Sequence, residues 1–128
     1  MGRWRAASPY ALAALLAGAG VTHFVSPGFY DALIPPALPQ PRAWIYGSGI
    51  LELGCAVAVA LPRSRRAGAL ASAVLLVAVF PGNVYLALEP GDVPRWLALA
   101  RLPVQVPLVL WALQVARTPD RSAGDLPR

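Results

Sequence analysis

The chain has 128 residues, which is enough for one domain. Its 57% hydrophobic and 13% charged residues and its mean hydropathy of +0.55 exclude an ordinary soluble domain, in which about a quarter of the residues are charged. The net charge of +5 comes from arginines clustered between apolar runs and at the ends, with no basic stripe interleaved with aromatics, so we expect no nucleic-acid partner.

Four apolar stretches are each long enough to cross a bilayer, which takes about 20 helical residues. They cover residues 8–24, 43–61, 67–88 and 96–116. Ser8 is the expected N-cap of the first helix and Pro9 its first helical residue. This first stretch is long for the apolar core of a cleaved secretory signal, so we interpret it as a span.

The connections between the four stretches are short, which predicts that consecutive helices pack as antiparallel neighbours. We therefore expect an all-α membrane protein, a four-transmembrane-helix antiparallel bundle that forms a single integral membrane domain over residues 1–128. Small residues at Gly18, Gly54 and Gly68 are expected to let helices approach closely. The lone Cys55 lies in an apolar run and is expected to be a small buried hydrophobe.

A proline-rich segment over residues 25–42 follows the first helix. Its prolines at 35, 36, 39 and 41 exclude a regular helix there. The stretch "GFYDAL" within it is expected to form one interfacial turn that covers the outer end of the bundle.

The arginine distribution predicts the orientation in the membrane, because cytoplasmic loops carry the excess of basic residues. One side holds eight arginines, namely Arg3, Arg5, Arg63, Arg65, Arg66, Arg117, Arg121 and Arg128. The other side holds Arg42 and Arg95. Both termini are therefore predicted to be cytoplasmic, and segment 25–42 to face outward.

Two formal charges lie inside the predicted spans, Glu52 and Arg101. A charged side chain at the bilayer centre costs about 2.5–3.5 kcal/mol on insertion scales. At a helical rise of 1.5 Å per residue, Glu52 lies roughly 14 Å and Arg101 roughly 8 Å from the outer helix ends. We therefore expect the Arg101 guanidinium to pair with the Glu52 carboxylate.

Further polar residues occur at similar depth, so that every helix contributes one to the outer half. They are His23, Asn83 and Gln105, with Ser48 and Tyr46 as supporting residues on the helix of Glu52. The inner halves hold no ionisable residue before the cytoplasmic edge. This pattern predicts a pocket open to the outer side or to the lateral bilayer, and it argues against a channel. A purely structural interpretation, in which a Glu–Arg pair sets helix register, stays open.

Four motifs together resemble the DoxX-like family of small four-helix membrane proteins. They are "HFVSPGFYDALIPPALP" (23–39), "YGSGILELG" (46–54), "VFPGNVY" (79–85) and "RLPVQ" (101–105). The resemblance runs from about His23 to Trp111. Its recurring polar positions map onto His23, Glu52, Asn83, Arg101 and Gln105, the set that depth alone selects.

This resemblance implies a multi-pass protein of the bacterial cytoplasmic (inner) membrane, with quinone-linked oxidation as an associated function. A single histidine makes a metal centre unexpected, and no intrinsic cofactor is expected beyond a bound quinone. Three hypotheses follow: a redox-associated accessory with a pocket for a quinone or small anion, a structural or assembly subunit without its own ligand, and a small transporter. The expected partners are the lipid bilayer and either a membrane oxidoreductase subunit or further copies of the chain. No motif decides whether the protein is an enzyme.

Overall fold

All regular structure in the computed structural model is helical over the residues that it describes, 2–118. The elements are α1 (Gly2–Val25), the 3₁₀ helix η1 (Pro27–Leu33), α2 (Pro41–Ala60), α3 (Arg65–Ala78), α4 (Phe80–Leu88) and α5 (Arg95–Arg117). Four segments are long and apolar enough to cross a membrane: α1, α2, α3 together with α4, and α5. The prediction of an all-helical fold with four candidate membrane spans is thus confirmed for the described residues. Arg121 and Arg128, which entered the orientation argument, lie outside the described residues.

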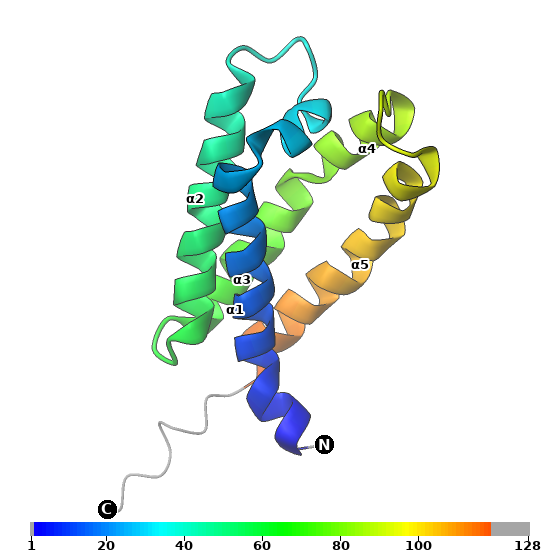
Figure 1. Cartoon of the computed structure of the whole chain (residues 1–128). Coiled ribbons are helices and arrows are strands. Elements are labelled where there is room, and N and C mark those ends of the chain that lie inside the picture. Colours follow the sequence, from blue (N-terminus) through cyan, green and yellow to red (C-terminus); the bar gives the residue numbers. More distant parts are fainter. Residues whose placement is uncertain (1, 119–128) are drawn as a thin grey trace, which may run out of the picture.

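The long helices alternate in direction along the chain (Figure 1). One end of the molecule holds η1 and the connection between α4 and α5, and we call it the η1 end. The opposite end holds the start of α1, the α2–α3 turn and the last turn of α5, and we call it the terminal end. Helix α1 packs mainly against α2, and α3 packs against α5. Element η1 lies across α1, α2 and α4.

Helix α1 begins earlier than the sequence predicted, which corrects the assignment of Ser8 as N-cap. The helix starts at Gly2, and Pro9 lies inside it. Tertiary contacts hold this first turn in place although Pro9 offers no backbone N–H. The indole Nε1 of Trp111 donates to Ser8 Oγ at 2.7 Å, and the Trp4 ring stacks on the Trp111 ring with 6.2 Å between centroids. These contacts join α1 to α5 at the terminal end.

The third span is broken, whereas the sequence predicted one segment over 67–88. Helix α3 ends at Ala78 and α4 starts at Phe80. Pro81 has no N–H to donate to the preceding turn. The N–H groups of Gly82 and Asn83 donate instead to the carbonyl of Val79. The second and fourth spans, Pro41–Ala60 and Arg95–Arg117, agree with the prediction to within two residues.

The two halves of the bundle are packed differently. The main buried apolar cluster gathers small and aliphatic residues of the terminal half, including Leu12, Val59, Ala69 and Ala112. Cys55 belongs to this cluster as a free thiol, as predicted. The buried His23, Asn83 and Gln105 lie outside this cluster, toward the η1 end. Apolar packing therefore fills one half of the bundle, and polar contacts organise the other.

Among the small residues expected at interfaces, Gly68 lies at a close contact. A Cβ added to Gly68 would lie 2.6 Å from the Ala58 Cβ. In contrast, Gly18 and Gly54 have no neighbouring atom within 4 Å of such a Cβ, so the expectation of close approach is wrong for these two positions.

We expect a Gly68→Ala variant to lose about 1–3 kcal/mol of stability, because the added methyl overpacks the contact between α2 and α3. Thermal or denaturant unfolding in detergent micelles measures this loss. The matched control is Gly54→Ala, where the methyl meets open space and helix propensity favours alanine by about 1 kcal/mol or less. Equal losses in the two variants would contradict the assignment of Gly68 to a close contact.

Candidate functional site

A cavity of about 410 Å³ lies in the η1 half, between the helices. It is lined by all five polar residues that the sequence singled out: His23, Glu52, Asn83, Arg101 and Gln105. Ser48 lines it as well, together with Tyr30 from η1. The rest of the wall is mostly leucine and other apolar residues. The volume falls within the range of sites for small molecules, about 300–1,000 Å³.

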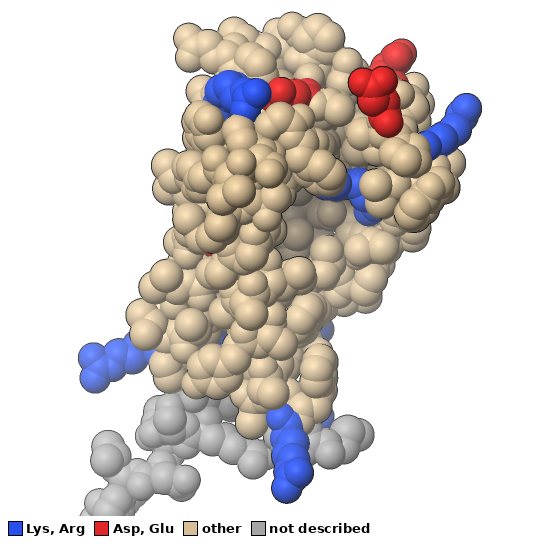
Figure 2. Space-filling view, viewed as in Figure 1, with Lys and Arg blue, Asp and Glu red and all other residues tan. Residues whose placement is uncertain are grey.

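The cavity opens on the side of the bundle where α1 and α5 diverge toward the η1 end. Figure 2 shows the surface hollowed between these helices on the face in view. Leu15 lines the cavity and is itself 46% exposed. For a helix bundle that spans a membrane, an opening on this lateral face leads to the lipid.

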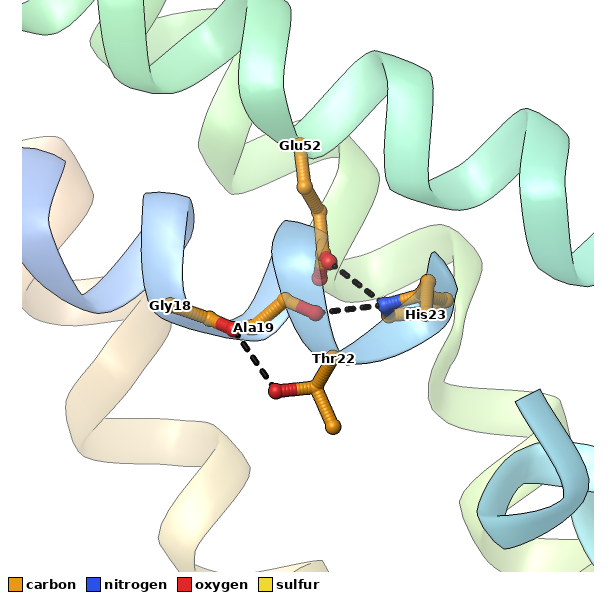
Figure 3. A network of polar contacts seen from close by, with 5 residues as sticks. All are labelled: Gly18, Ala19, Thr22, His23 and Glu52. Carbon is orange, nitrogen blue, oxygen red and sulfur yellow. Dashed lines mark hydrogen bonds and ion pairs between the residues drawn. The ribbon is translucent and has the colours of Figure 1, made fainter. Parts of the chain in front are cut away.

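One wall of the cavity joins α1 and α2 through a histidine and a carboxylate. His23 Nδ1 lies 3.1 Å from Glu52 Oε2 and 2.7 Å from the backbone carbonyl of Ala19 (Figure 3). A carbonyl only accepts, so the Nδ1 atom carries a proton and donates it to Ala19. Glu52 Oε2 thus stays a buried oxygen without a hydrogen-bond partner within residues 2–118, although it lies at ion-pair distance from the imidazole.

A glycine makes this wall possible. A Cβ added to Gly49 would lie 2.8 Å from the His23 Cβ and 2.8 Å from the Phe24 ring. The absence of a side chain at Gly49 therefore lets α1 approach α2 one turn before Glu52. In the "GSGILE" stretch, the second glycine brings His23 to the carboxylate.

Tyr30 completes this wall, although the sequence analysis did not predict it as a site residue. Its ring stacks on the His23 imidazole, with centroids 3.8 Å apart and planes inclined by 16°. Burial, and next the nearby charge of Glu52, raise the pKa of the Tyr30 phenol above its ordinary value. The phenol therefore keeps its proton at neutral pH and presents a hydroxyl group. Its place in "GFYDAL" predicted an interfacial turn and gave no signal for a site.

The opposite wall joins α4 and α5 through amides and a guanidinium. Asn83 Nδ2 donates to Gln105 Oε1 at 3.2 Å, and Arg101 Nε donates to Asn83 Oδ1 at 3.1 Å. Gln105 Nε2 donates to the Leu76 carbonyl, in the last turn of α3 before the break. Within residues 2–118, Arg101 makes its side-chain hydrogen bond through Nε, so its two terminal nitrogens have no hydrogen bond there, and the residue lines the cavity.

The expected pairing of Glu52 with Arg101 is wrong. The Glu52 carboxyl group contacts His23, and Arg101 binds Asn83. The two charges stand on different walls of one cavity because each is held by a neighbour in its own helical hairpin. This leaves a carboxylate oxygen and guanidinium N–H groups available to a third molecule.

Two other predicted residues take different places. Ser48 lines the cavity one turn before Glu52. The ring of Tyr46 stacks on that of Phe24, with 5.5 Å between centroids, and 38% of the residue is exposed. Tyr46 does not line the cavity.

Within residues 2–118, no three His, Cys, Asp or Glu side chains gather as metal ligands.

Comparison with known proteins gives one match, to a family described as a domain of unknown function (DUF8561), over residues 12–116. The chain belongs to this family. The matched range includes every residue of both cavity walls. No curated protein and no solved structure matches the chain. The resemblance to the DoxX-like family stays a prediction.

Double-mutant cycles test which residues share hydrogen bonds. We expect Asn83→Ala and Gln105→Ala to couple by about 0.5–3 kcal/mol, because the two amides contact each other. Glu52→Gln and Arg101→Met are expected to be additive within about 0.5 kcal/mol. Unfolding of the ligand-free protein in mixed micelles measures both cycles. Stronger coupling of Glu52 with Arg101 than of Asn83 with Gln105 would restore the ion pair that the sequence suggested.

Proposed function

We propose that this protein binds a small amphipathic molecule in the cavity, with an anionic or carbonyl oxygen held by Arg101. A quinone meets this description, and so does a small apolar acid. The observation that carries the proposal is the placement of a carboxyl group and a guanidinium group on separate walls of one apolar cavity. If Glu52 and Arg101 served only to set helix register, we would expect the two groups to bond directly to each other.

The cavity residues have complementary chemistry for such a ligand. The terminal nitrogens of Arg101 donate to the ligand oxygen, while Asn83 and Gln105 hold the guanidinium in position. Glu52 Oε2 accepts a hydrogen bond or a proton from the far side of the ligand. His23 supports the carboxylate, and the Tyr30 hydroxyl is a further polar group at the η1 end. The apolar remainder of the wall suits the ring or short chain of the ligand.

In the same proposal, the chain is a DoxX-like four-helix antiparallel bundle of the bacterial cytoplasmic membrane, with both termini in the cytoplasm and the proline-rich loop outside. It acts as an accessory to a membrane oxidoreductase and presents a quinone or small anion to it. The arginine distribution supports the orientation. The lateral opening of the cavity supports entry of the ligand from the lipid.

A second candidate is an assembly subunit without a ligand. The exposed Gly18 on α1 and Gly54 on α2 favour it, because space around both positions would admit a partner helix. The buried residues of the terminal half are apolar or, like Ser8 and Ser72, uncharged, which counts against a transporter with an ion path through that half.

Ligand binding is tested with the full-length protein in detergent, titrated separately with a short-chain benzoquinone and with benzoate. We expect Arg101→Met to weaken binding about tenfold or more, because a charge-assisted hydrogen bond contributes about 1.5–3 kcal/mol. Glu52→Gln removes the charge at nearly constant volume and is expected to weaken binding of the ligand that donates to it. Mass spectrometry of molecules that co-purify with each variant identifies the natural ligand.

The matched control is Arg42→Met, which makes the same change at an exposed arginine paired with Asp31 outside the cavity. Equal binding by wild type, Arg101→Met and Arg42→Met would contradict the ligand site. A stoichiometric membrane partner that still co-purifies with a folded Arg101→Met variant would favour the assembly subunit instead.

A further inference from the structure

A second hollow, of about 380 Å³, lies at the terminal end between the start of α3 and the end of α5. It is lined by Arg66, Leu70, Leu113, Ala116 and Arg117. None of these residues lines the cavity of the η1 half. The hollow is therefore a separate feature of the molecule, and its arginines have so far served only to predict the orientation in the membrane.

Its two walls repeat one arrangement. Arg66 stands four residues before Leu70 in α3, and Leu113 stands four residues before Arg117 in α5. Residues four apart lie on the same helix face, one turn from each other. Each wall therefore places an arginine at the helix end with a leucine one turn deeper. In a spanning bundle the arginines lie at headgroup depth and the leucines at the start of the hydrocarbon.

The arginines of the hollow differ from the neighbouring Arg65 in their contacts. Arg65 donates to the carbonyls of Val59 and Ala60 at 2.9 and 3.1 Å and lies over the Tyr10 ring. Its guanidinium is thus committed to the end of α2. Arg66 and Arg117 make no side-chain hydrogen bond or ion pair within residues 2–118, and both are exposed.

The surrounding charge is positive. Arg3, Arg5 and Arg63 add to the arginines at this end, whereas the acidic residues outside the spans, within 2–118, are Asp31, Glu89 and Asp92 at the η1 end. Figure 2 shows the acidic surface of the face in view gathered at that end. A phosphate group approaching the hollow therefore meets attraction and, from the described residues of this end, no opposing carboxylate.

We propose that this hollow binds an anionic phospholipid. Arg66 and Arg117 hold the phosphodiester from two sides, and the acyl chains run along Leu70 and Leu113 into the bilayer. The site links the start of α3 to the end of α5, so the bound lipid bridges these two helices. It is independent of any ligand in the cavity of the η1 half.

Native mass spectrometry of the full-length protein, delipidated and then mixed with phosphatidylglycerol or phosphatidylcholine, tests this site. We expect retained phosphatidylglycerol on the wild type and about fivefold weaker retention for each of Arg66→Gln and Arg117→Gln. The matched control is Arg63→Gln, which removes the same charge from the same turn but outside the hollow. Thermal unfolding verifies that each variant is folded.

Four outcomes would overturn the assignment. Equal losses in Arg63→Gln and Arg66→Gln would show attraction by overall charge without a site. Equal retention of phosphatidylcholine would show a site that ignores headgroup charge. Displacement of phosphatidylglycerol by millimolar inorganic phosphate would show a phosphate site without a role for the acyl chains. Unchanged retention after Leu113→Asn would point in the same direction.

Discussion

The η1 half of the bundle depends on the break between α3 and α4. The regular ladder of backbone hydrogen bonds stops at Val79, two residues before Pro81, and the Leu76 carbonyl in the last turn before the break accepts a hydrogen bond from the Gln105 side chain of α5. Gln105 is in turn held by Asn83, which also fixes Arg101. An irregularity of backbone at membrane depth is tolerated where neighbouring side chains satisfy it. The same repair commits Arg101 to the α4–α5 wall and away from Glu52.

As a result, the carboxyl group of Glu52 and the guanidinium of Arg101 line one cavity but contact different residues. His23 and Tyr30 organise the carboxylate side, and two amides organise the guanidinium side. Neither wall needs the other for its own hydrogen bonds, so the cavity between them is lined by a buried Glu52 oxygen without a hydrogen-bond partner in the described residues and by a guanidinium bonded there through Nε alone. The terminal half contrasts with this arrangement, because small residues such as Ala69 and Gly68 let the helices pack closely there around an apolar cluster.

The sequence predicted the helical class, the number of candidate spans and five of the polar residues that line the cavity, because hydropathy and depth both follow from position along a helix. It missed what depends on rotation and on contacts between helices. Glu52 and Arg101 both lie in the outer half of their helices, but the partner of Glu52 depends on the close approach of α1 to α2 at Gly49. The start of α1 was misplaced because Trp4 and Ser8 are held by Trp111, a residue more than a hundred positions away. Tyr30 was missed because stacking on His23 leaves no mark in a hydropathy pattern.

The division of polar contacts between the two halves of the chain bears on how the protein enters a membrane. His23 and Glu52 belong to the hairpin of α1 and α2, while Asn83, Arg101 and Gln105 contact one another within the segment from α3 to α5. Each part of the chain therefore contains both members of its polar contacts when it is synthesised. When the first hairpin leaves the ribosome, it already contains both Glu52 and its neighbour His23. Arg101 is synthesised some fifty residues after Glu52. A pairing of Glu52 with Arg101 would have left the carboxyl group in the membrane without its partner until the last helix, which carries Arg101, was inserted.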